Sequence, residues 1–383
     1  MKIWGCIILI VTALLLPAEA WAAQDMESSV HSQLEEQLDA VGRDELMAQV
    51  PEATRKLMES EELYDMSFKS LIGMTPGRFF STLWRIFLDG LKKPIRALGT
   101  MLGIVLLCSL LESLRAGSFQ EALSGVFQTI SVLCILTSIA MPVLDCIMKV
   151  SATIKNVALF MLSFIPIFSA AMVSAGQPIS GSTYSIFLMG VCQLVAQVIS
   201  QTLIPLMSVY LAISICGSFV PDLKVVSAVG GIKTAINWAM GFMLTVFVAL
   251  LSIQSILSYS ADGVTVKATK FLIASLVPVA GSVLSDAFTA AYGCLRLVKT
   301  TIGVYGIIVV LLTFLPILLQ VTIWMAITRV IAVASDVMGI TRVSDILRSS
   351  ANVLGMLISV VLCFGLLVVV STGVVMAIGT GGG

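Results

Sequence analysis

The sequence predicts an all-α, polytopic helical membrane protein, and three features of its composition support this fold class. Hydrophobic residues make up 58% of the chain, charged residues make up only 11%, and the mean hydropathy is +1.04. Soluble proteins carry roughly 25% charged residues, and a soluble fold has no way to bury this much apolar surface. Basic and acidic residues number 22 each, which argues against a nucleic-acid-binding surface.

The first 23 residues have the layout of a secretory signal peptide. A lysine at position 2 precedes an apolar run over residues 7–16 and a small-residue stretch over 18–23. Charge, short apolar core and A-x-A box are the parts of such a signal. We therefore expect residues 1–23 to be a signal peptide and residues 24–75 to lie outside the cytoplasm. An uncleaved anchor helix is the alternative.

Residues 24–75 are expected to form a short, acidic, extracytoplasmic helical segment. Residues 24–70 hold twelve acids and four bases, whereas the chain from residue 71 onward holds nine acids and seventeen bases. Apolar residues recur at helical spacing from Val30 to Val41, and a second helix is expected around 52–66. About fifty residues make a marginal core, so this segment is expected to be a docking element.

Residues 76–96 predict an amphipathic helix in the membrane interface. Aromatic and leucine side chains between Phe79 and Leu91 can share one helical face, with Arg78, Arg85 and Lys92 off that face. This pattern is typical of a helix that lies among lipid headgroups. A helix packed against the protein body is the alternative.

A multi-span membrane domain is expected over residues 97–378, with a disordered glycine tail at 379–383. A hydrocarbon core of about 30 Å needs about 20 residues of helix. The candidate spans are 97–114, 122–144, 156–175, 184–204, 203–220, 236–258, 271–290, 302–327 and 352–378. The run 184–220 has Pro205 near its middle and is either one broken helix or a hairpin. We expect about eight spans, with a range of roughly seven to ten, and basic residues do not orient them.

Two parts of this domain resemble each other and predict an internal repeat of 154–258 and 265–378. The matching pairs are Lys155 and Lys267, Ser163 and Ser275, Pro166 and Pro278, Lys233 and Arg348, and Asn237 and Asn352. The prolines stand in SFIPI and SLVPV, 112 residues apart. Chance similarity between apolar sequences is the alternative. Inverted repeats with interrupted helices recur in secondary transporters.

Few residues of the membrane domain suggest chemistry. The single histidine, His31, lies in the acidic segment, and the eight cysteines are scattered without a CxxC pair. We therefore expect no catalytic residue, no metal site and no cofactor.

A charge in hydrocarbon is costly and tends to be functional, so an acid within a predicted span is a candidate functional residue. Asp286 is the candidate intramembrane acid, and an interfacial cap or ion pair is its alternative. The acids expected in loops are Asp145, Asp222, Asp262, Asp336 and Asp345.

Three glutamines, Gln193, Gln197 and Gln201, are four residues apart and predict a polar stripe along one helix. Lipid offers amides no hydrogen-bond partner, so the stripe is expected to face protein or water. It then serves either interhelical packing or the lining of a conduit.

The run DGVTVKATKFLIASLVPVAGSVLSDAF (262–288), followed by VKTTIGVYGI (298–307), resembles the stage III sporulation protein AE family. The layout of signal peptide, acidic segment and multi-span body resembles it too. The resemblance implies a non-enzymatic membrane subunit of the mother-cell/forespore channel-like complex, which endospore formation and late forespore gene expression require in a Gram-positive bacterium.

The resemblance also implies partners and a location. The partners are the lipid bilayer, other stage III sporulation membrane proteins of the same complex and a forespore membrane partner. The location is the mother-cell membrane surrounding the forespore, with the N-terminal segment extracytoplasmic. No catalytic residues are carried over from the family. A secondary transporter built from the two repeated halves is the alternative function.

Overall fold

The computed structural model describes residues 42–60, 76–115, 121–219, 225–276 and 281–377, and every element in them is a helix. The elements are α3 (Arg43–Ala48), α4 (Glu52–Ser60), α6 (Pro76–Arg115), α7 (Glu121–Ser174), α8 (Pro178–Val198), the π-helix η1 (Ile199–Leu203), α9 (Ile204–Phe219), α10 (Val225–Leu276), α11 (Gly281–Val337) and α12 (Thr341–Ala377). The prediction of an all-α polytopic membrane protein is confirmed. Six helices in the described part are long and apolar enough to cross a membrane.

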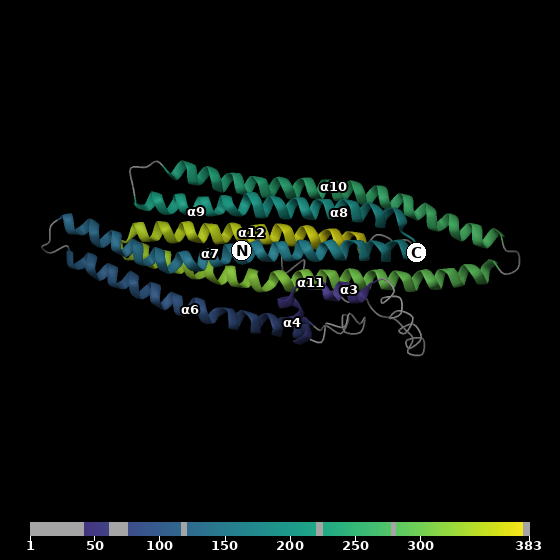
Figure 1. Cartoon of the computed structure of the whole chain (residues 1–383), viewed down its shortest axis with the longest axis horizontal. Helices are drawn as coiled ribbons and strands as arrows, with labels where there is room; N and C mark the ends of the chain where they lie inside the picture. The colour runs from purple at the N-terminus through teal and green to yellow at the C-terminus, as the bar shows by residue number, and fades with distance from the viewer. Residues whose placement is uncertain (1–41, 61–75, 116–120, 220–224, 277–280, 378–383) are drawn as a thin grey trace.

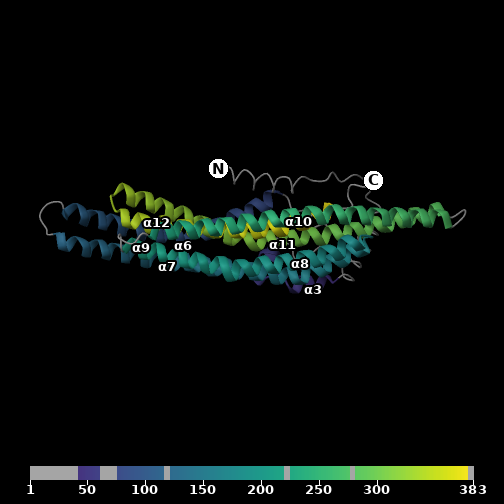
Figure 2. The same cartoon turned by 90° about the horizontal axis from the view of Figure 1, so that it is seen from above.

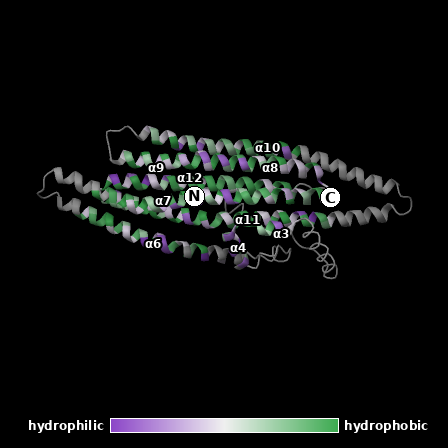
Figure 3. Cartoon of the chain, in the orientation of Figure 1, coloured by the Kyte–Doolittle hydropathy of each residue, from purple (hydrophilic) through white to green (hydrophobic). Residues whose placement is uncertain are grey.

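The long helices lie side by side as one elongated bundle. α10 lies at one edge, followed by α8–α9, α12, α7 and α11, with α6 at the opposite edge (Figure 1). The view from above shows the same rods in a shallow bundle (Figure 2). α11 packs along α12 and α7, and α8 packs along α7. Hydrophobic residues dominate the rods, while hydrophilic residues gather on α4 and the first part of α6 (Figure 3).

Two glycines end long helices in the same way. Gly176, after α7, and Gly339, after α11, both have a left-handed backbone with φ of 73° and 79°. The amide of Gln177 donates to the carbonyl of Met172, and the amide of Ile340 donates to that of Ser335. These bonds are those of a Schellman motif, which a residue without Cβ adopts at little cost. Each motif reverses the chain into the next helix.

The predicted spans are fused into fewer, longer helices. Spans 122–144 and 156–175 both fall within α7, which has 54 residues and no interruption. The acids and bases between them do not break the helix, because neither Asp nor Lys prevents helical geometry. The count of six helices in the described part therefore differs from the expected eight.

The run 184–220 is one rod, so its interpretation as a hairpin is wrong. α8, η1 and α9 follow one another without a turn. Pro205 is accommodated by the π-helix that precedes it, and the chain does not reverse there. The alternative of a single helix with a local break is the one observed.

The structure describes only part of the N-terminal segment. α4 begins at Glu52, where the second helix of the acidic segment was expected, and residues 61–66 lie outside the described residues. The signal peptide, the helix around Val30, His31 and the glycine tail also lie outside them. The helix predicted at 76–96 is the first half of α6, which continues through Pro94 into the predicted span 97–114.

Four acids assigned to loops lie inside helices instead, so that expectation was wrong. Asp145 is in α7, Asp262 in α10, Asp336 in α11 and Asp345 in α12. Asp145 is paired with Lys149 four residues on, and Asp336 with Arg348 across the α11–α12 turn. Asp does not interrupt a helix, and these two ion pairs add to the stability of the helices that carry them. Asp222 lies outside the described residues.

The tightest packing joins α7, α11 and α12. A Cβ on Gly303 would lie 3.0 Å from the Phe168 ring and would also meet Met376, and a Cβ on Gly306 would overlap the Phe164 ring. Both phenylalanine side chains are fully buried and stack on each other, with centroids 5.4 Å apart. A side chain at position 306 would have to displace the buried Phe164 ring, whereas one at position 303 would displace the flexible end of Met376 and crowd Phe168.

This packing predicts that Gly306→Ala destabilises the protein by about 1–3 kcal/mol, the usual cost of overfilling a packed core. Gly241→Ala on α10 is the matched control, because nothing lies within 4 Å of a Cβ there. Thermal unfolding of the purified protein in detergent measures the difference. Equal midpoints for the two variants would contradict the packing described.

Candidate functional site: polar groups inside an apolar bundle

The glutamine stripe (Gln193, Gln197 and Gln201) is split between two environments. Gln193 is half-buried, and its Nε2 donates to the carbonyl of Ala158 on α7 at 3.2 Å. Gln197 and Gln201 are exposed, and Nε2 of Gln197 donates to Oε1 of Gln201 at 3.4 Å. Within the described chain, one glutamine therefore joins two helices and two glutamines lie on the outer surface.

The π-helix beneath this stripe follows from Pro205. Proline has no amide hydrogen and its ring clashes with the carbonyl four residues earlier, here that of Gln201. The amide of Ile204 donates to the carbonyl of Ile199, five residues back, which widens the turn. Wide turns of this kind occur frequently at functional sites. The sequence thus places an irregular backbone next to the two exposed amides.

A lysine lies level with the exposed glutamines. The rings of Phe168 and Tyr184 are in contact at 5.4 Å, and Gln193 reaches Ala158, so α7 and α8 run antiparallel. This register puts Gln197 beside the turn of α7 that carries Lys155, which is exposed. Hydrocarbon would leave these groups without hydrogen-bond partners. This part of the surface is therefore unsuited to lipid.

A second lysine, Lys299 of α11, is fully buried. Its Nζ donates to Oε1 of Gln177 at 3.0 Å and to the carbonyl of Val375 at 3.4 Å. Val375 lies in the last turn of α12, where carbonyls lack intrahelical partners. Gln177 is the residue that closes the α7 Schellman motif. Lys299 therefore joins the ends of two helices.

The environment of Lys299 offsets part of the cost of burying an ammonium group. A helix C-terminus carries a partial negative charge of about half an electron, and the carbonyl of Val375 in the last turn of α12 accepts from the lysine. Nearby, the hydroxyls of Tyr184 and Thr372 share a hydrogen bond of 3.2 Å, which ties α8 to the same part of α12. These contacts hold α7, α8, α11 and α12 in one arrangement.

A third polar cluster joins α9, α10 and α12. Nζ of Lys233 donates to Oδ1 of Asn352 at 3.2 Å, and Nδ2 of Asn352 donates to the hydroxyl of Tyr210 at 3.4 Å. Tyr210 is buried and the other two side chains are half-buried. The cluster links the two predicted repeats, since Lys233 lies in 154–258 and Asn352 in 265–378.

The charged groups on α7 form a further link. Asp145 accepts from Lys149 at 2.8 Å and from Nε2 of Gln320 on α11 at 3.4 Å. Asp286, the candidate intramembrane acid, lies in α11, but its side chain is outside the described residues. No functional role for Asp286 is therefore tested by the structure.

The structure describes only one of the two repeat-related prolines. Pro166 is inside α7, where it is exposed. Pro278 falls between the end of α10 at Leu276 and the start of α11 at Gly281, outside the described residues. The internal repeat therefore stays a prediction.

Lys299, Gln177 and Asn352 were not predicted as site residues. The predicted span began at residue 302, which left Lys299 at its edge, and only acids were considered as intramembrane charges. The available signal was a lysine beside two threonines in VKTTIGVYGI, inside an otherwise apolar run. In the described part of the chain, no cluster of three or more His, Cys, Asp or Glu side chains could hold a metal ion.

Long apolar helices joined by internal polar contacts define a polytopic helical membrane protein. The chain belongs to the family described as Stage III sporulation protein AE, whose profile matches residues 58–379. A curated relative, the stage III sporulation protein AE of Bacillus subtilis (strain 168), is 25% identical over 219 residues, which is 56% of this chain and 54% of the relative. The match thus spans about half the length of that relative. No solved structure gives a significant match.

The Lys299 contacts predict that Lys299→Met lowers stability by about 1–3 kcal/mol, because two buried acceptors lose their donor. Adding Gln177→Leu should restore part of the loss, since replacing both partners with apolar groups removes an unsatisfied amide. Lys149→Met, at a half-exposed ion pair, is the control and should change stability by less than about 1 kcal/mol. Thermal unfolding in detergent reports all three, and an unchanged midpoint for Lys299→Met would refute the assignment.

Proposed function

We propose that this protein is a non-enzymatic integral membrane subunit of a channel-like complex between mother cell and forespore. In this proposal the complex is required for endospore formation and for late forespore gene expression. Membership of the stage III sporulation protein AE family supports the link to sporulation. The internal polar contacts of the bundle are structural links between helices, which suits a scaffold or conduit.

The observation that carries the proposal is the exposed pair Gln197 and Gln201, level with Lys155. Their mutual hydrogen bond uses one donor and one acceptor, and leaving the remaining amide groups unpaired in hydrocarbon costs several kcal/mol on apolar transfer scales. A protein that works alone in lipid would gain stability by replacing these residues with leucine. A subunit of a complex keeps them because protein or water covers that surface. The proposal therefore assigns this surface to a contact or to a conduit wall.

The partners and location follow from the same proposal. The protein lies in the mother-cell membrane surrounding the forespore, with its N-terminal segment extracytoplasmic. It assembles there with other stage III sporulation membrane proteins and with a forespore membrane partner.

A secondary transporter is the second candidate function, and one observation favours it. The cluster of Lys233, Asn352 and Tyr210 joins the two predicted repeats with polar groups, and transporters place their sites between such repeats. Solute uptake by the purified protein alone, in vesicles, would support this candidate over the subunit.

The proposal predicts that the double variant Gln197→Leu/Gln201→Leu inserts into the membrane at normal abundance but fails to support spore formation. Gln193→Leu is the matched control. It loses one interhelical hydrogen bond, worth about 0.6 kcal/mol on average in membranes, and should sporulate normally.

Affinity purification of the tagged protein from sporulating cells, with counts of heat-resistant spores, measures both variants. Wild type and Gln193→Leu should retain the same membrane partners. Normal sporulation of the double variant would remove the functional role of the exposed glutamines. Reduced abundance in step with lost sporulation would reassign them to packing within the chain.

A further inference from the structure

A charged helix of the N-terminal segment packs against the middle of the longest apolar helix. The hydroxyls of Thr54 in α4 and Thr313 in α11 share a hydrogen bond of 2.7 Å. Met58 of α4 and Leu46 of α3 are fully buried, and α3 packs on α7. Both helices lie along this one flank of the bundle, beside α11 and α6 (Figure 1). We call the surface made by α3, α4 and the parts of α7 and α11 beneath them the head flank.

The depth of this contact is fixed by α12, the most apolar of the long helices. Residues 349–377 of α12 contain no charged residue. A membrane-crossing segment of about 20 residues placed anywhere in that stretch always includes residues 358–368. Phe364 lies in this interval and packs on Phe314, with ring centroids 6.0 Å apart. Thr313, the neighbour of Phe314, is therefore within the depth of the hydrocarbon core.

The outer face of α4 is charged at that depth. The side chains of Lys56 and Glu52 are 70% and 71% exposed and form an ion pair of 3.0 Å. Arg55 and Glu59 form a second, looser pair at 3.7 Å, with side chains 41% and 52% exposed.

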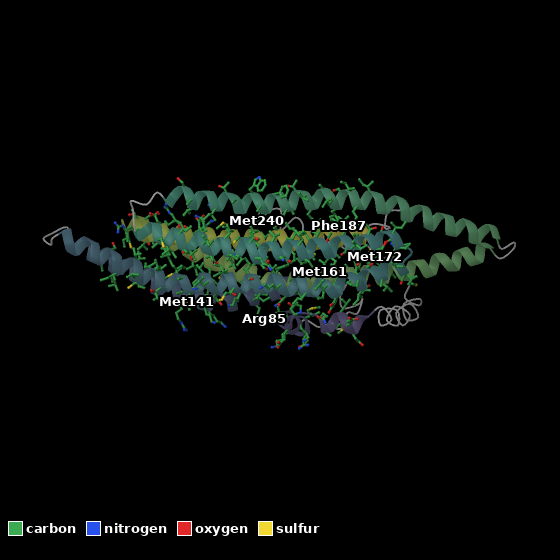
Figure 4. The ribbon with its side chains drawn as sticks, turned by 45° about the horizontal axis from the view of Figure 1, so that its top comes forward. Arg85, Met141, Met161, Met172, Phe187 and Met240 are labelled. Carbon is green, nitrogen blue, oxygen red and sulfur yellow. The ribbon has the colours of Figure 1, made fainter. Side chains whose placement is uncertain are left out.

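Lipid cannot cover these four groups. A charged side chain at the centre of a bilayer costs about 2.5–3.5 kcal/mol on insertion scales, and ion pairing offsets only part of that cost for the two pairs on α4. Arg85 of α6 adds a further exposed base on the same flank (Figure 4).

The opposite edge of the bundle has the character of a lipid contact. Trp238, Phe242 and Ile253 of α10 are all more than half exposed. The thiol of Cys363 lies 4.0 Å from the carbonyl of Met240, so Trp238 is at the depth of Cys363 and Phe364. At one depth, the bundle therefore exposes apolar side chains on α10 and charged side chains on α4.

We infer that the head flank faces water at the depth of the hydrocarbon core, and that this flank forms one wall of a water-filled pathway. The first half needs only the geometry above. The second half rests on the proposed function, because a wall becomes a pathway only in the assembled complex. A wall of this kind admits polar solutes, whereas a flank covered by lipid would exclude them.

The test compares two introduced cysteines of equal exposure and equal depth. Lys56→Cys and Trp238→Cys replace side chains that are 70% and 69% exposed. The purified full chain is reconstituted into phosphatidylcholine vesicles, and a membrane-impermeant maleimide is added on both sides. Peptide mass spectrometry measures labelling at each position, so the native cysteines stay in place. The thiolate is the reacting form, and it forms in water and not in hydrocarbon, so position 56 should label about tenfold faster or more.

A second variant confirms that α4 is docked during the measurement. Thr54→Cys/Thr313→Cys should form a disulfide on mild oxidation. Slow labelling at both positions would mean that lipid covers the head flank and would overturn the inference, as would fast labelling at position 56 without the cross-link. The vesicles contain no partner protein, so failure of the subunit proposal would not alter either result.

Discussion

The whole structure depends on one constraint: a polar group inside an apolar bundle needs a partner, because hydrocarbon supplies none. Lys299 meets this constraint with the end of α12 and with Gln177, and Lys233 meets it with Asn352. These contacts join helices that are distant in sequence, so the polar residues fix which helices are neighbours. The apolar residues provide the area and much of the stability, but a hydrophobic surface is not directional.

The same constraint separates the surfaces of the bundle. The inward-pointing side chains of Lys299, Lys233 and Asn352 are paired with a backbone carbonyl or with other side chains. Gln197, Gln201 and the charged face of α4 point outward, where the chain itself supplies only partial pairing. α10 exposes tryptophan and phenylalanine instead. Such unequal surfaces suit a chain that contacts lipid on one side and protein or water on the other. The proposed subunit of a membrane complex would have these surroundings.

Composition alone predicted the fold class, and the polar stripe was visible from its spacing. The arrangement of the helices was not predictable in the same way. Hydropathy locates apolar segments but does not distinguish a turn from a continuous helix, so the spans within α7 were separated and 184–220 stayed ambiguous. Pro205 is compatible with a hairpin or with a continuous rod that contains a π-helix, and only the packing of the bundle selects the continuous rod. Lys299 lies at the edge of the predicted span, and that position in the sequence suggests that its side chain reaches water. In the bundle the side chain is instead enclosed by α12 and the α7–α8 turn.

We infer that the level of the bundle marked by Thr313, Phe364 and Trp238 lies inside the bilayer. Polar groups at this level therefore need water or protein as partners. A variant that keeps Trp238 and replaces the other four tryptophans with phenylalanine measures this depth directly. Its fluorescence is recorded in vesicles whose lipids carry bromine either near the headgroup or near the ends of the acyl chains. If this level lies inside the bilayer, bromine near the chain ends quenches the fluorescence of Trp238 more strongly. Stronger quenching by bromine near the headgroup would place this level at the membrane surface and show that the placement is wrong.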